Sequence, residues 1–68
     1  MSDADAQKRA AGEAAAALVE DGMVVGLGTG STAIWFVKAL AARRLNITCV
    51  ATSVSTAELA ADLGMRLA

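Results

Sequence analysis

The chain has 68 residues, which allows one small domain, and a chain of this size buries only about 60% of its unfolded surface. Hydrophobic residues make up 56% of the sequence and charged residues 19%, which excludes a disordered tail, and a formal net charge of -1 provides no basic surface for nucleic acid. A single cysteine, Cys49, and no histidine exclude an intrachain disulfide and argue against a zinc site.

The first predicted element is a helix from Asp3 to Glu20. This stretch is rich in alanine, the best helix former, and Ser2 with Asp5 fits a capping box. Arg9 and Glu13 are four residues apart and can form a weak ion pair. We expect the helix to pack through a face of mostly small residues, which are Ala10, Ala14, Ala17 and Leu18.

A buried strand and a glycine-rich turn follow the first helix. Asp21-Gly22 is a turn signal, and the short β-branched run Met23–Leu27 predicts a strand that is covered on both faces. Gly26, Gly28 and Gly30 then remove three side chains in quick succession. The backbone can take positive φ there, and a ligand can approach the main chain closely.

A second helix is predicted over residues 31–44, and Ser31 and Thr32 stand at its start. Free N–H groups and the positive end of the helix dipole meet at such a point, which favours binding of a phosphate. Ile34 and Trp35 indicate a second covered face. The positions expected to face the sheet are Ala33, Phe36, Val37 and Leu40.

The remaining elements repeat this order. Ile47–Ala51 predicts a second strand in which Cys49 is a small buried hydrophobe, and the hydroxyl-rich segment 52–56 predicts a second turn. Ser55 with Glu58 fits a capping box for a third helix, which ends near Asp62 or Leu63 before Gly64. Residues 65–68 then read as the opening of a third strand.

Helices that alternate with strands predict an α/β fold of the Rossmann-like, three-layer kind with a parallel sheet. The order is α-β-α-β-α-β, with the last strand incomplete, and the two strand-to-helix turns follow strand ends at the same edge. Ligands bind at that edge in such sheets. We therefore expect the two hydroxyl-rich turns to lie side by side.

Three kinds of phosphate site can be compared with the glycine turn. A P-loop needs a lysine after its last glycine, where this chain has Ser31. The segment Gly28–Ala33 matches the G-x-G-x-x-A dinucleotide pattern, but the second strand ends in Ala51-Thr52-Ser53, without the acid that binds a ribose. A site for a small sugar phosphate explains the hydroxyl groups of both turns.

Each candidate residue also has a purely structural interpretation. The glycines can serve a tight turn alone, and Ser31 and Thr32 can cap the helix. Turn and capping roles suit Thr52, Ser53 and Thr56 best. Without further information Lys8 would be a solvated surface lysine, and Trp35 a core or interface residue.

The sequence resembles the N-terminal part of the A-type ribose-5-phosphate isomerases. Nearly the whole chain takes part in the resemblance. The segments that carry it are Lys8-Arg9-Ala10-Ala11-Gly12, Gly26-Leu27-Gly28-Thr29-Gly30-Ser31-Thr32-Ala33, Thr52-Ser53-Val54-Ser55-Thr56 and Leu63-Gly64-Met65. The resemblance implies an enzyme of the pentose phosphate pathway that interconverts ribose 5-phosphate and ribulose 5-phosphate without a metal or organic cofactor.

The same resemblance implies a set of substrate-binding residues. They are Thr29, Gly30, Ser31, Thr32 and Lys8, with Gly28, Thr52, Ser53 and Thr56 as secondary candidates. In that family the acid, base and cation come from DGAD-like and KGGG-like segments and a glutamate, and these 68 residues contain none of them. No catalytic residue is assigned here, and we expect the isolated chain to be inactive, weakly stable and prone to self-association.

The resemblance therefore predicts that residues 1–68 are an N-terminal fragment of a single sugar-phosphate-binding α/β domain. A non-catalytic sugar-phosphate or nucleotide-binding module is the alternative. No apolar run approaches the ~20 residues that span a bilayer, and no secretion signal is visible. We expect a cytoplasmic protein, homo-oligomeric at full length, whose partner is a small sugar phosphate and neither nucleic acid nor membrane.

Overall fold

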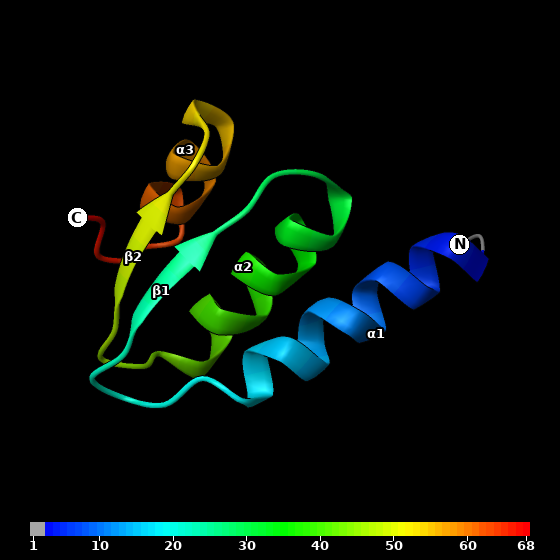
Figure 1. The fold of residues 1–68 in the computed structure, drawn as a ribbon, viewed down its shortest axis with the longest axis horizontal. Helices are drawn as coiled ribbons and strands as arrows, with labels where there is room; N and C mark the ends of the chain where they lie inside the picture. The colour runs from blue at the N-terminus through cyan, green and yellow to red at the C-terminus, as the bar shows by residue number, and fades with distance from the viewer. Residues whose placement is uncertain (1–2) are drawn as a thin grey trace.

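The computed structural model describes residues 3–68, which form three helices and two strands in alternation (Figure 1). The predicted capping box includes Ser2 and lies outside the described residues. The predicted α/β order is confirmed. The elements are α1 (Asp3–Ala17), β1 (Val24–Leu27), α2 (Ser31–Arg43), β2 (Thr48–Ala51) and α3 (Val54–Asp62).

The two strands are parallel, and their register runs from Val24 opposite Thr48 to Leu27 opposite Ala51. The end of the chain returns to the far side of β2. There the Cys49 N–H donates to the Arg66 carbonyl at 2.9 Å, and the Ala68 N–H donates to the Cys49 carbonyl at 2.9 Å. The expected third strand thus begins with a single parallel bridge, between Cys49 and Leu67.

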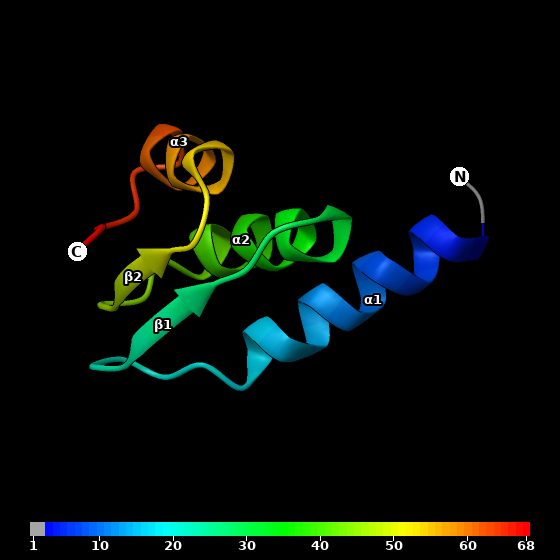
Figure 2. The same ribbon diagram turned by 45° about the horizontal axis from the view of Figure 1, so that its top comes forward.

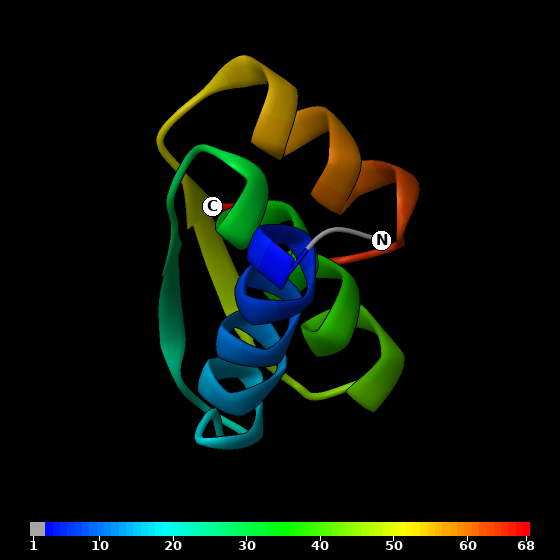
Figure 3. The ribbon, with the colours of Figure 1, turned by 90° about the vertical axis from the view of Figure 1, so that its right-hand side faces the viewer.

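All three helices lie on one face of the sheet (Figures 2 and 3). The side chains of Val25, Leu27 and Cys49 point toward the helices and are buried, whereas Val24 on the other face is 73% exposed. The expectation that β1 is covered on both faces is therefore wrong for the described residues. The chain crosses from β1 to β2 and from β2 to the returning segment in the same direction, and crossovers of the usual right hand then place α2 and α3 on the same side.

The core lies between the sheet and α2. Its fully buried side chains include Leu27, Val37, Leu40 and Cys49, so the predicted inward stripe of the second helix is confirmed at its centre. Burial raises the pKa of the Cys49 thiol above its ordinary value, because desolvation disfavours the thiolate. Cys49 is the small buried hydrophobe that its position in the strand predicted.

Helix α1 packs on α2 through a different face from the predicted one. Ala10, Ala14 and Ala17 are exposed, whereas Gly12 and Ala16 are buried. A Cβ at Gly12 would lie 2.7 Å from the Phe36 backbone nitrogen, so only glycine permits this approach. Alanine occurs on every side of this helix and gives no periodic signal, which is why the face was misplaced.

Helix α1 also ends earlier than expected, at Ala17. The Arg43 guanidinium donates to the carbonyl oxygens of Ala16 and Val19, both at 2.6 Å, in the region where a helix end lacks its full set of backbone partners. Beyond this point Leu18 is 78% exposed. The last residue of α2 thus fixes the end of α1.

The indole of Trp35 lies against α1. Arg9 and Lys38 each place their charge 5.3 Å from the ring centroid. Arg9 also forms the predicted ion pair with Glu13, at 2.6 Å. The second covered face expected from Trp35 is therefore the α1 contact, while Ile34 remains 44% exposed.

Candidate functional site

The first turn of α2 is open at the carboxyl end of β1. Gly30 is the N-cap residue, with φ 97 and ψ 176, and no side chain caps this helix. Among residues 3–68, no acceptor takes the N–H groups of Ser31, Thr32 and Ala33. Three amides and the positive end of the helix dipole are therefore available to an anion.

The glycines before α2 differ in what they contribute. Only Gly30 has the expected positive φ, whereas Gly26 and Gly28 do not. A Cβ built on any of these three glycines would meet nothing within 4 Å. The turn is thus exposed on the side that a ligand would approach, and Thr29, Ser31 and Thr32 are exposed with it.

The second hydroxyl-rich turn lies beside the first, as predicted. The Thr52 hydroxyl donates to the Leu27 carbonyl at 3.0 Å, and the Thr52 N–H donates to the same oxygen at 3.1 Å. The Thr56 hydroxyl donates to the Gly28 carbonyl at 3.1 Å. These bonds join the two turns at the edge where the strands end.

Helix α3 is capped by Ser53, not by the predicted Ser55. The Ser53 hydroxyl accepts from the Thr56 N–H at 3.3 Å and donates to the Thr56 hydroxyl at 3.0 Å. Thr56 is 7% exposed. The sequence contains two overlapping capping patterns, Ser53 with Thr56 and Ser55 with Glu58. The helix uses the first of them, so its cap lies two residues before the predicted one.

Lys8 lies on α1, one turn before Gly12, and is exposed. Gly12 approaches the Thr32 carbonyl, which would be 3.1 Å from a Cβ at that position. Residues four apart share one side of a helix, so Lys8 lies on the side of α1 that faces the start of α2. Gly12 was not singled out from the sequence, although a glycine inside an alanine-rich helix is a signal for close packing.

The carboxylates of the chain lie on α1, on α3 and in the turn before β1. The Asp21 carboxylate accepts from the Asn46 N–H at 2.6 Å, at the opposite end of the strands, and Glu20 is beside it. Glu58 and Asp62 lie on α3 and are exposed. The described residues contain no cluster of three potential metal ligands. None of these carboxylates lies in either hydroxyl-rich turn.

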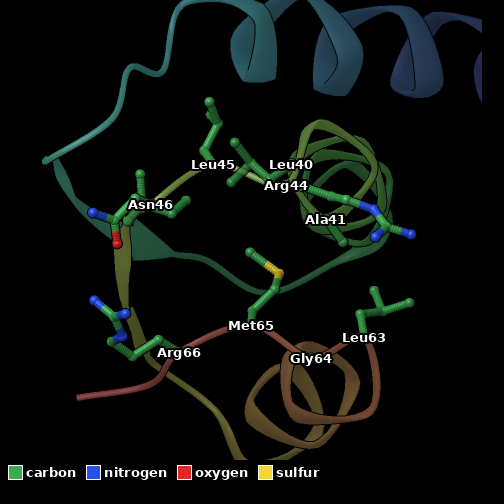
Figure 4. Close-up of a pocket in the computed structure, with 10 residues that line it drawn as sticks. Leu40, Ala41, Arg44, Leu45, Asn46, Leu63, Gly64, Met65 and Arg66 are labelled. Atoms are coloured by element: carbon green, nitrogen blue, oxygen red, sulfur yellow. The ribbon is translucent and has the colours of Figure 1, made fainter.

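Two hollows in the described part of the chain lie elsewhere. One, of about 570 Å³, separates the end of α2 from the segment after α3, and Met65 points into it between Leu40 and Leu63 (Figure 4). The other, of about 420 Å³, lies between α1 and α2 beside Trp35. Neither hollow is lined by a predicted substrate-binding residue, so the candidate site is an open edge.

Together these features define an α/β domain built on a strand, glycine turn and helix, whose sheet edge at the carboxyl ends of the strands carries free amides and hydroxyls. No helix in the part of the chain described here is long and apolar enough to cross a membrane. The chain belongs to the family described as the DeoR C terminal sensor domain, which matches residues 3–67.

The predicted resemblance to the N-terminal region of ribose-5-phosphate isomerase A is also confirmed. The chain is 72% identical over 64 residues to ribose-5-phosphate isomerase A of Caulobacter sp. (strain K31), a match that covers 94% of this chain and 28% of that protein. The chain therefore spans less than a third of the length of this relative.

Solved structures agree with the sequence match. Ribose 5-phosphate isomerase A from Methanocaldococcus jannaschii superposes with a TM-score of 0.90 at 37% identity, over 94% of this chain and 30% of that one. A D-ribose-5-phosphate isomerase in complex with phospho-erythronic acid superposes with a TM-score of 0.87 at 35% identity, over the same shares of the two chains.

Proposed function

We propose that residues 1–68 are the N-terminal, substrate-holding part of a ribose-5-phosphate isomerase, which interconverts ribose 5-phosphate and ribulose 5-phosphate. The observation that carries this proposal is the 72% identity to such an enzyme together with the uncapped start of α2. The protein would act in the cytoplasm, in the pentose phosphate pathway, as a homo-oligomer and without a cofactor.

In this proposal the phosphate of the sugar binds at the start of α2. The N–H groups of residues 31–33 would donate to phosphate oxygens, with the hydroxyls of Ser31 and Thr32 beside them and Lys8 adding a positive charge. Thr29 and Gly30 shape the turn. A complex of one solved relative with phospho-erythronic acid supports a phosphorylated ligand.

The second turn would act indirectly in the same proposal. Thr52 and Thr56 use their hydroxyls to hold Leu27 and Gly28, and Ser53 caps α3, so these residues would position the first turn and not touch the phosphate. Gly28 would contribute its open backbone. In this proposal Thr52, Ser53 and Thr56, which were secondary candidates for substrate binding, position the glycine turn.

The chemical step requires groups that this edge does not carry. Aldose-ketose isomerisation moves a proton between adjacent carbons, which needs a base, and it develops an oxyanion, which needs a positive group. Because neither hydroxyl-rich turn contains a carboxylate, we assign the base and the electrophile to residues outside these 68. The isolated chain should then bind substrate without turning it over.

The test is a titration of the 68-residue chain with ribose 5-phosphate, followed by the amide NMR signals of residues 28–33. These signals should shift with ribose 5-phosphate and not with ribose. Thr32→Ala should weaken binding by about tenfold, since a hydrogen bond to a charged group is worth roughly 1.5–3 kcal/mol.

The matched control for this titration is Thr48→Ala, at the opposite end of β2. This variant also removes a threonine hydroxyl, but from a residue that does not contact the turn. It should leave the affinity for ribose 5-phosphate unchanged. No shift at residues 28–33, or equal losses in the two variants, would overturn the proposed phosphate site. Turnover by this chain would contradict the assignment of the base outside it.

A non-catalytic module that senses a phosphorylated sugar is the second candidate. The match to a sensor-domain family over residues 3–67 favours it. It predicts the same phosphate binding, so the titration alone does not separate the two. Expression of the complete coding sequence and an isomerase assay would separate the two candidates. Turnover supports the enzyme, and retained binding without turnover supports the sensor.

A further inference from the structure

Helix α1 touches the backbone of α2 at Gly12. A Cβ on Gly12 would lie 2.7 Å from the Phe36 nitrogen and 2.9 Å from the Trp35 Cβ. The Thr32 carbonyl oxygen would be 3.1 Å away. These atoms belong to the backbone or are bonded directly to it, so they cannot rotate aside as the tip of a long side chain could. A larger residue at position 12 must therefore move one helix away from the other.

Lys8 continues the buried side of α1 beyond this contact. Gly12 and Ala16 are the buried residues of the helix, and they are four residues apart. Lys8 comes four residues before Gly12, so it lies on the same side of the helix, but it is exposed. Its ammonium forms no ion pair or hydrogen bond within residues 3–68. Among these residues the Lys8 charge is therefore not committed to another group.

The rise of the two helices places Lys8 level with the free amides of α2. Both helices run in the same general direction, and α1 extends past the start of α2 (Figures 1 and 2). A helix rises about 1.5 Å per residue, so Lys8 lies about 6 Å before Gly12. On the same scale Ser31 lies about 7.5 Å before Phe36. Because Gly12 lies opposite Phe36, Lys8 comes beside the first turn of α2.

We propose that Gly12 is a positioning residue of the phosphate site, because the close approach that it permits fixes where α1 holds the Lys8 ammonium beside the amides of residues 31–33. This inference rests on the proposed function. Gly12 itself touches no ligand and acts through Lys8. The contact between α1 and α2 is fixed at its other end by Arg43, whose guanidinium donates to two carbonyls at the end of α1.

The test is a double-mutant cycle of Gly12→Ala and Lys8→Ala in the 68-residue chain. The affinity for ribose 5-phosphate is measured from the amide signals of residues 28–33. Lys8→Ala removes the charge and should weaken binding by about tenfold, whereas Gly12→Ala displaces the charge and should weaken binding by about threefold. Gly12→Ala should have no further effect once Lys8 has been replaced. A purely structural role of Gly12 would give the same effect in both backgrounds.

Arg43→Met is the matched control for Gly12→Ala. It loosens the same helix contact at the end far from Lys8, so it should lower stability and leave the affinity unchanged. A second variant tests the placement of the charge while Gly12 is kept. Lys8→Ala combined with Ala10→Lys moves the charge to an exposed position on another side of α1. This variant should bind as weakly as Lys8→Ala alone, and it decides the question if Gly12→Ala does not fold.

The outcomes separate this inference from the phosphate site. Suppose that the unsubstituted chain gives the ribose 5-phosphate shifts. An unchanged affinity in Gly12→Ala, equal losses in both backgrounds, an equal loss in Arg43→Met, or an affinity restored by Ala10→Lys would each overturn the positioning role and leave the phosphate site standing. Absence of these shifts in the unsubstituted chain would overturn the phosphate site and the positioning role together.

Discussion

The two helices that follow strands begin at the same edge of the sheet, yet they begin in opposite ways. At α3 the Ser53 hydroxyl accepts from a first-turn N–H, and Thr56 is buried. At α2 the cap is Gly30, and the hydroxyls of Ser31 and Thr32 leave the first-turn amides free. Similar hydroxyl-rich sequences thus give one helix start that is complete within the protein and one that is available to a ligand.

Helix α1 packs against the first turns of α2 at Gly12, and Gly12→Val should disrupt this contact. The new side chain would overlap the backbone of Phe36 and the Cβ of Trp35, which lie 2.7 and 2.9 Å from a Cβ at this position. We expect a loss of about 3 kcal/mol in the free energy of unfolding, measured by urea denaturation with far-UV circular dichroism. The control is Ala14→Val, on the exposed side of α1; equal losses in the two variants would contradict the close approach.

The link between the two helix starts is the Thr56 hydroxyl. Thr56→Val keeps the shape of the side chain and removes its hydrogen bonds to Gly28 and Ser53. We expect a loss of about 1.5 kcal/mol, and faster exchange of the amides in the glycine turn. Thr48→Val is the control, since the Thr48 side chain forms no hydrogen bond within the described residues. If Thr56→Val leaves turn exchange unchanged, the two starts are not coupled.

Two serine substitutions measure how much each helix start contributes to stability. Ser53→Ala removes the cap of α3 and should lower the free energy of unfolding by about 1 kcal/mol. Ser31→Ala removes a hydroxyl that has no hydrogen bond to any of residues 3–68, so stability should change by less than about 0.5 kcal/mol. Denaturation of both variants side by side is the measurement. A destabilisation by Ser31→Ala as large as that by Ser53→Ala would show that Ser31 has a structural role.

What the sequence predicted well depends on signals that a single segment carries. The apolar run before Gly28 predicts β1, and the stripe with Val37 and Leu40 predicts α2. The alternation of helix and strand predicts the fold class. Topology then placed the two turns side by side, because the ends of parallel strands share an edge. The α/β fold and the position of the candidate site follow from these patterns.

What the sequence did not predict depends on contacts between segments. The face of α1 was misplaced because alanine surrounds that helix, and Gly12 was chosen by the approach of α2. Capping of α3 at Ser53 was decided by its bond to Thr56, where two patterns overlapped. The absence of a side-chain cap on α2 could not be predicted either. Judged by residue type alone, Ser31 is as good a capping residue as Ser53.

The position of Trp35 determines what an optical experiment on this protein would detect. The chain has one tryptophan and no tyrosine, and that indole lies between Arg9 and Lys38 where α1 meets α2. Intrinsic fluorescence therefore reports the separation of these two helices. An intermediate in which α3 alone has detached would keep native emission while its ellipticity had already fallen, so the two signals together can reveal the order in which the layers come apart.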